Sequence, residues 1–190
     1  LNAGAEGYNT AVGNLAGTAM TTGTTNTLVG SHAGDAITEA ADNVAIGDSA
    51  GDAITTGSDN TFVGDNAGGA NTTGAESVAV GSEALDAQTT GGYNVGVGFQ
   101  ALTANTTGDY NVAVGRTSLT ANTTGDSNVG IGFAALNATT TANQNVAIGA
   151  LALDANTTAS NNTAVGVSDL GQNTTGYLNT ALGHNSMAIN

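Results

Sequence analysis

The sequence has no cysteine, no proline and no tryptophan, and it carries one basic residue, Arg116, against 15 acidic residues. Without cysteine and with only two histidines, one chain can build neither a disulfide framework nor a zinc site. A net charge of -14 argues against nucleic acid and anionic membrane surfaces as partners, because both are bound mainly through Lys and Arg. No apolar run approaches the roughly 18 residues of a membrane span, so we expect no membrane insertion of this segment.

Large apolar residues are also scarce: Leu, Ile, Val and Phe together make up 35 of the 190 residues. Such a composition with high net charge is typical of disordered chains. A strict period opposes that expectation. The pentapeptide Asn-x-small-(Val/Ile/Leu)-Gly recurs every 17 residues without insertion or deletion, starting at Asn9, Asn26, Asn43, Asn60, Ser77, Asn94, Asn111, Asn128, Asn145, Asn162 and Asn179.

We number the repeat from this first residue, so that the Asn is position 1. Position 5 is Gly and position 4 is Val, Ile or Leu in every copy, and position 13 is Thr in every complete copy. Examples of the columns that define the repeat are Asn9, Asn43, Asn94 and Asn111 at position 1, Gly13, Gly47, Gly98 and Gly115 at position 5, and Thr106 and Thr123 at position 13.

This pattern predicts an all-β fold, a parallel β-solenoid or β-roll of eleven 17-residue coils. The alternation at positions 1 to 4 indicates a short strand, and the Gly at position 5 indicates a corner with positive φ or close backbone approach. We expect a second extended stretch at positions 8 to 12, and then a Thr-Thr-Gly turn in which Gly supplies the permissive dihedral. Helix is disfavoured because Gly, Thr and Asn are poor helix formers.

The chain forms a single repeat array, 1–190, in two types of coil. In residues 1–76 position 9 is Gly, whereas in residues 77–190 it is Leu or Met. Where position 9 is Gly, larger side chains stand nearby, at position 12 (Met20, Ile37, Ile54) or position 3 (Leu28, Phe62). This pattern indicates volume compensation in a shared core. A fusion of two repeat types would give the same pattern. The array starts and stops within a repeat, so we expect a segment of a longer fibre.

About three large apolar residues per coil are few to stabilise an isolated coil. We therefore predict that identical chains pack or intertwine as a homotrimer. The strip expected to pack between chains is Ala at positions 8 and 11 with Leu at position 9. Small residues there would allow close approach of the backbones.

Asn94–Gly108 and Asn111–Gly125 share the motif Asn-Val-Ala-Val-Gly-x-x-Ala-Leu-x-Ala-Asn-Thr-Thr-Gly, with Gly96 and Ser118 as exceptions. This motif resembles the 17-residue repeats of phage tail-fibre and related bacterial surface proteins. Ser77–Gly81 more distantly resembles the head repeats of trimeric autotransporter adhesins. The resemblance implies a trimeric parallel β-roll in an extracellular fibre, on a virion tail or a bacterial surface. Such a segment acts as a rigid spacer and attachment surface. It is expected to be no enzyme, and its partners would be identical chains, a host receptor or glycan, or neighbouring fibres.

Stacking would align acidic residues of equal position. Asp42, Asp59 and Glu76 share position 17, and Asp48 and Asp65 share position 6. Such oxygen ladders could hold Ca²⁺, although solvated surface charge explains them as well, and we expect no other cofactor.

Two further sets of columns, one of Thr and one of aromatic residues, remain open to interpretation. The Thr columns at positions 13 and 14 could match an ice lattice, which makes an ice-binding solenoid the alternative function, but turn chemistry also explains them. Tyr93 and Tyr110 share position 17, and Phe99 and Phe133 share position 6 on either side of Arg116. Exposed aromatic residues of this kind could bind sugars or pack between chains.

Overall fold

A computed structural model describes residues 7–187, and over this range the protein is all-β with no helix. The same range therefore holds no apolar helix that could cross a membrane. Each repeat contributes one strand of three residues at positions 2 to 4. The strands are β1 (Thr10–Val12), β2 (Thr27–Val29), β3 (Val44–Ile46), β4 (Thr61–Val63), β5 (Val78–Val80), β6 (Val95–Val97), β7 (Val112–Val114), β8 (Val129–Ile131), β9 (Val146–Ile148), β10 (Thr163–Val165) and β11 (Thr180–Leu182).

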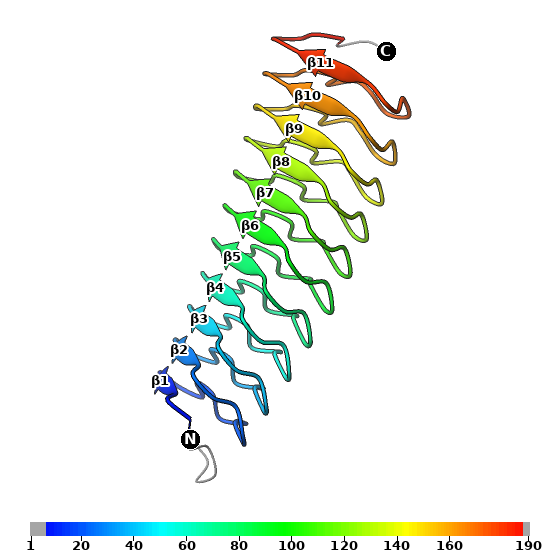
Figure 1. Ribbon diagram of the computed structural model, residues 1–190. Helices are drawn as coiled ribbons and strands as arrows, with labels where there is room; N and C mark the ends of the chain where they lie inside the picture. Colours follow the sequence, from blue (N-terminus) through cyan, green and yellow to red (C-terminus); the bar gives the residue numbers. More distant parts are fainter. Residues whose placement is uncertain (1–6, 188–190) are drawn as a thin grey trace.

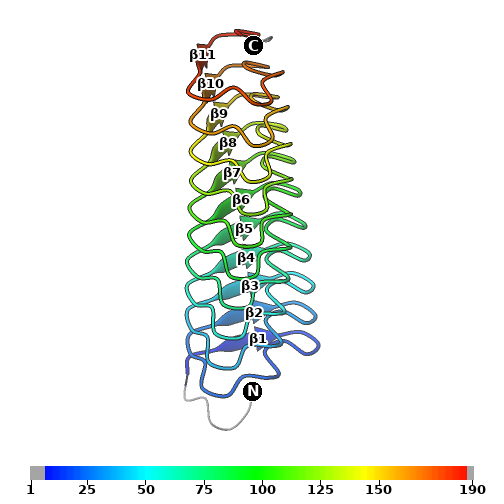
Figure 2. The ribbon, with the colours of Figure 1, turned by 90° about the vertical axis from the view of Figure 1, so that its right-hand side faces the viewer.

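The eleven strands form one parallel sheet in which sequence order is also spatial order. Every residue pairs with its equivalent 17 positions away; Val95, for example, pairs with Val112. The coils therefore stack into a rod, with the described ends of the chain at opposite ends of it (Figure 1), and the view turned by 90° shows the same column (Figure 2). At about 4.8 Å per coil the sheet is about 50 Å long. The predicted parallel β-solenoid in strict register is confirmed.

The return path behind the sheet differs from the prediction. Positions 6 to 11 form consecutive turns rather than a second extended stretch. Positions 7 and 9 lie in the left-handed region, with φ of 55° at Gln100 and 55° at Leu102. Neighbouring coils are still joined here, because the N–H of Leu102 donates to the carbonyl of Ser118 at 3.0 Å. The small and amide residues of this stretch thus form a hydrogen-bonded ladder of turns.

The two glycine columns have different causes. At position 5 the prediction is confirmed: Gly98 has φ of 133°, and a Cβ built on it would lie 2.7 Å from the carbonyl oxygen of Gly115. At position 15 the predicted permissive dihedral is wrong, because Gly108 is absent from the positive-φ residues. Here a Cβ on Gly108 would lie 2.4 Å from the Gly125 carbonyl oxygen, so the column is small because coils approach closely.

The core lies within the single coil column, between the sheet and the ladder of turns. It is built from the side chains at positions 3, 8, 9 and 12, together with the Asn of position 1. In a leucine-type coil such as 94–110, only Leu102 is a large apolar side chain among the fully buried ones. The column is therefore thin, and small side chains and amides occupy much of it.

The two coil types fill the same space in different ways. A Cβ built on Gly34 would lie 2.8 Å from both Ile37 Cδ1 and Leu28 Cδ2, so these side chains occupy the volume that Leu takes in later coils. In the leucine-type coils position 12 is polar and buried, as at Asn105 and Asn122. The predicted volume compensation is thus seen directly, and core packing is continuous across the change of coil type at residue 77.

Candidate functional surface

The outer face of the sheet carries two columns of side chains that point away from the core. Position 3 of each strand is directed inward, and positions 2 and 4 are directed outward, as the burial of β6 and β7 shows. Position 2 is Val or Thr and position 4 is Val, Ile or Leu in all eleven strands. We call these two columns the outer strip. No charged residue stands in it.

The outer strip is uncharged and mostly apolar, with Thr at position 2 of five strands, and it is incompletely covered. Its position 4 residues are 38% exposed at Val80 and 39% exposed at both Ile46 and Ile148. The strip is about 50 Å long and about 10 Å wide, or roughly 500 Å² in projection. The largest apolar patch on a typical monomer covers about 300–600 Å² and is often functional, so a strip of this size is a candidate interaction surface.

This arrangement corrects the strip that the sequence suggested as an interface. Ala101 and Leu102, at positions 8 and 9, are fully buried in the core of their own coil, so they cannot contact another chain. Only position 11 of that set is half-buried. The sequence carried a signal for the correct face: position 3 is mostly small and position 4 always large, which indicates that the larger residue lies outside a narrow core.

The Asn column at position 1 ties the coils together beneath the sheet. Asn94 Oδ1 accepts hydrogen bonds from the backbone N–H and from Nδ2 of Asn111, at 2.9 and 3.3 Å. Asn111 Nδ2 also donates to the Gly125 carbonyl at 2.8 Å, which closes its own coil. The Asn column therefore forms an amide ladder along the rod. Its members Asn43, Asn94 and Asn111 are buried, and Asn9 begins the ladder by accepting from Asn26.

The ladder adapts where Ser77 replaces Asn. The Ser77 side chain is shorter than Asn: its hydroxyl oxygen still accepts from the Asn94 N–H of the next coil, at 3.3 Å, but Asn94 Nδ2 does not donate to it. Gln88 takes over the missing contact, because its Nε2 donates to Ser77 Oγ and its Oε1 accepts from Asn94 Nδ2. Gln at position 12 therefore compensates for Ser at position 1 of the same repeat.

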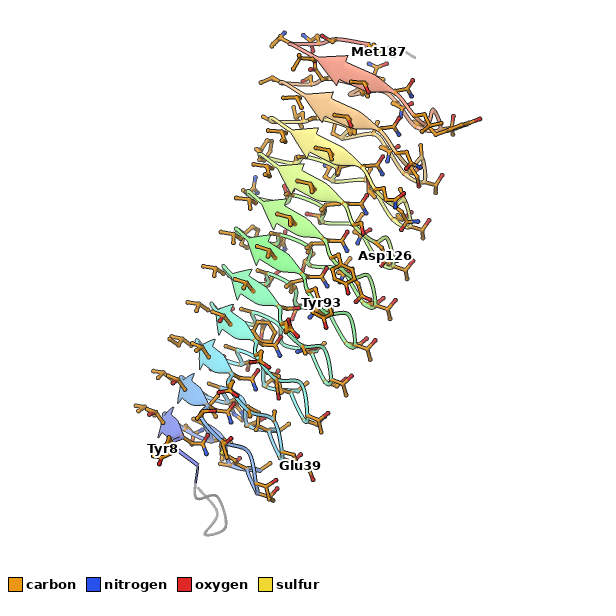
Figure 3. The ribbon with its side chains drawn as sticks, viewed as in Figure 1. Tyr8, Glu39, Tyr93, Asp126 and Met187 are labelled. Carbon is orange, nitrogen blue, oxygen red and sulfur yellow. The ribbon has the colours of Figure 1, made fainter. Side chains whose placement is uncertain are left out.

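The Thr column at position 13 is also a ladder. Thr106 Oγ1 donates to the Thr123 carbonyl at 2.9 Å, and Thr123 Oγ1 donates to the Thr140 carbonyl at 3.1 Å. These hydroxyls are used within the chain. Of the two Thr columns considered for ice binding, position 14 is the one that remains fully exposed, and it lies at the loop tips, as Glu39 in Figure 3 shows.

The acidic columns considered for calcium lie at the two edges of the sheet. Asp42, Asp59 and Glu76 stand where the chain enters β3, β4 and β5, and Asp48 and Asp65 stand where it leaves β3 and β4; all five are exposed. Over residues 7–187, no three acidic or histidine side chains come together around one point that could hold a metal ion. Calcium binding stays a prediction that these side chains within one chain do little to support.

Three acidic residues at position 10, on the back of the rod, have perturbed ionisation. Partial burial raises the pKa of Asp86, and the neighbouring charges of Glu83 and Asp65 raise it further. Burial and the charge of Asp35 likewise raise the pKa of Asp52, and burial alone raises that of Asp154. A different feature escaped the sequence interpretation: Asp169, the single acid at position 8, is fully buried, and its Oδ2 has no hydrogen-bond partner.

Aromatic side chains gather at both edges of β6, β7 and β8. Tyr93 and Tyr110 stack with ring centroids 4.8 Å apart and planes 9° apart. The Glu76 carboxylate, followed by Tyr110, raises the pKa of Tyr93. On the other edge, the guanidinium of Arg116 lies 5.8 Å from the ring centroids of both Phe99 and Phe133.

Comparisons with family models, with curated proteins and with solved structures gave no match for this chain. Function is therefore argued from the geometry of the rod and from the residues on its surface.

Proposed function

We propose that this chain is a structural segment of an extracellular fibre in which three copies pack their outer strips around a common axis. The segment would act as a rigid spacer in a phage tail fibre or a bacterial surface adhesin, and its exposed loops would be available for attachment to a host surface. The single observation that carries the proposal is the outer strip. It is a continuous, uncharged face of Val, Ile, Leu and Thr on a protein whose net charge is -14.

The thin core supports the association of several chains. Each leucine-type coil buries one large apolar side chain, as Leu102 illustrates, while two β-branched or aliphatic side chains per coil point outward. Packing three strips together would convert these outward residues into a shared core and would add about 0.5–1 kcal/mol for each partly exposed Val or Ile that becomes buried. Two strips could also pack face to face, as in a β-sandwich, and it is the resemblance of the repeat to trimeric fibre proteins that favours three copies.

The mechanical role follows from the continuity of the ladders. The backbone sheet, the Asn ladder and the Thr ladder all run along the rod, and each joins one coil to the next by hydrogen bonds. Bending or extending the rod would strain all three together, so a repeat array of this kind transmits force and holds distance. The resemblance of Asn94–Gly108 to tail-fibre repeats points to the same role.

Sedimentation velocity of the wild type and of a strip variant tests the proposal. We expect the variant Val95→Asp/Val112→Asp to dissociate, because it places two charges per chain where three chains meet. The matched control Thr107→Asp/Thr124→Asp adds the same charge at the loop tips and should remain trimeric. A wild type that sediments as a single chain would contradict the proposal, as would a strip variant that assembles as well as the control.

A further inference from the structure

The rod carries complementary residues on the two edges of the sheet, and they occur on the same three strands. We define the entry edge as positions 16 and 17, before each strand, and the exit edge as position 6, after each strand. Tyr93 and Asp126 lie on the entry side of the sheet in Figure 3. At β6 to β8 the entry edge is formed by Tyr93, Asp109, Tyr110 and Asp126, and the exit edge by Phe99, Arg116 and Phe133.

These residues are unusual for their columns. Asp109 and Asp126 are the two acids at position 16 in the whole sequence, and Arg116 is its one basic residue. Asp109 precedes β7 and Asp126 precedes β8, while Arg116 follows β7. Along the rod the cation thus stands between the levels of the two carboxylates, which are one coil apart, but at the opposite edge of the sheet.

The aromatic residues, Arg116 and Asp126 are exposed, and Asp109 is half-buried. Asp109 Oδ1 accepts from the Gly92 N–H and Asp126 Oδ1 accepts from the Asp109 N–H, both at 2.8 Å. Phe99 and Phe133 are 41% and 47% exposed, and Tyr93 and Tyr110 are 46% and 58% exposed. Among residues 7–187 the single ion pair is His32–Asp35, so Arg116 forms none within its own chain. Two stacked tyrosines and a Phe–Arg–Phe stack are rigid, amphipathic groups of the kind that dominate protein interfaces.

We infer that the exit edge of β6 to β8 docks against the entry edge of the same strands in a neighbouring copy of this chain, with Arg116 between Asp109 and Asp126. The inference rests on the trimer proposed above. Rotation about an axis parallel to the rods leaves height unchanged, so each exit edge faces the entry edge of the same coils in the next copy. The contact is heterologous and closes after three copies. Charge complementarity then aligns the three rods in register.

In the first half of the rod, the same docking geometry brings like charges together instead of opposite ones. At β3 the exit edge carries Asp48, and the entry edges of β3 and β4 carry Asp42 and Asp59. Docked copies would bring these like charges together, which is unfavourable unless solvent screens them. Arg116 therefore favours the contact, and Asp48 opposes it.

Charge exchange tests the inference on the intact chain. Arg116→Asp should raise the dissociation constant of the trimer by about tenfold or more, and Asp109→Arg/Asp126→Arg should weaken it as well. The combined triple variant should return to within about threefold of the wild type. Thr107→Asp/Thr124→Asp changes the net charge by the same two units as Arg116→Asp, but at the loop tips, and should leave the dissociation constant unchanged.

A second arm uses the first half of the rod. Asp48→Arg should tighten the trimer, whereas Glu39→Arg, with the same change of charge at a loop tip, should not. If the wild type is trimeric and its dissociation constant is changed neither by Arg116→Asp nor by the charge exchange at Asp109, Arg116 and Asp126, this inference is overturned and the proposed function is left intact. A wild type that is monomeric at all concentrations would overturn both.

Discussion

The ring of Phe62 occupies the space that a side chain at Gly68 would need: a Cβ built on Gly68 would lie 2.5 Å from Phe62 Cε2. Phe62 also covers Gly51 in the preceding coil, where the corresponding distance to Cδ2 is 3.0 Å. One bulky residue at position 3 thus replaces the leucine that later coils carry at position 9. This relationship explains why the array can change coil type without a break in its core.

The pairing of Phe62 with Gly68 predicts strong coupling between the two positions. Gly68→Leu alone should lower the free energy of unfolding by about 2 kcal/mol or more, because it overpacks the core. Phe62→Ala alone should lower it by about 3–5 kcal/mol, because it leaves a cavity. The double variant should cost clearly less than the sum, since Asn71 already provides the polar position 12 of a leucine-type coil. Denaturant titration of all four chains measures this; additive costs would contradict the shared volume.

Because of the Asn ladder, we expect the replacement of one buried Asn by Ala to lower the free energy of unfolding strongly. Asn111→Ala removes the acceptor for the Asn128 N–H at 2.9 Å and for its Nδ2 at 3.2 Å, and it takes from the Gly125 carbonyl one of its two donors, the other being Asn122 Nδ2 at 3.0 Å. Leaving buried groups unpaired should cost about 3 kcal/mol or more. Asn137→Ala, at a half-buried position whose side chain makes no hydrogen bond in the described part of the chain, should change stability little. Equal effects of the two variants on thermal unfolding would argue against a structural ladder.

We expect the replacement of the buried Asp169 by Ser to stabilise the fold. Its Oδ1 accepts from the Ser186 N–H at 2.7 Å, but Oδ2 is buried without a partner. The equivalent Ser118 instead donates to the carbonyls of Gly130 and Ala135. Asp169→Ser should therefore raise the free energy of unfolding by roughly 1–3 kcal/mol, because it removes an unpaired buried carboxylate oxygen. Thermal unfolding at neutral pH checks this, and a less stable variant would show that the carboxylate has a role its contacts do not reveal.

The acids of position 10 predict how stability depends on pH. Because the folded chain raises the pKa of Asp52 and Asp86 above their ordinary value of 3.8, it binds protons more tightly than the unfolded chain does. Their ionisation therefore destabilises the fold above the folded pKa, and the penalty disappears as the pH falls below 3.8. Asp86→Asn should raise the melting temperature at pH 7 and have little effect near pH 3. Asp48→Asn, at an exposed corner, is the control; the account fails here if both variants show the same pH profile.

Much of the fold could be predicted from the repeat because each coil contacts its own copies. The fixed 17-residue spacing predicted the parallel register, and the Gly column at position 5 predicted the corner after each strand. The return path at positions 6 to 11 could not be predicted, since left-handed φ at residues such as Gln100 and Leu102 runs against ordinary preference and depends on the ladder of neighbouring turns. The outer face was assigned wrongly because two apolar columns competed for one thin core, and only packing decides that Leu102 lies inside and Val114 outside.

The complementary residues at the two edges of β6 to β8 could not be predicted from the sequence pattern either. The 17-residue period places Phe99, Arg116 and Phe133 in one column at position 6, and from this we expected exposed aromatic side chains. What it did not reveal was that the guanidinium lies 5.8 Å from both ring centroids, or that the stacked pair of Tyr93 and Tyr110 stands at the other edge of the same strands. Those relationships depend on side-chain conformation.

The mass of the native assembly tests the central claim most directly. Sedimentation equilibrium of the wild-type chain at neutral pH and moderate salt should give three times the chain mass of 18.2 kDa over a wide range of concentration. A single species at 18.2 kDa, folded and stable with its outer strip in water, would contradict the account.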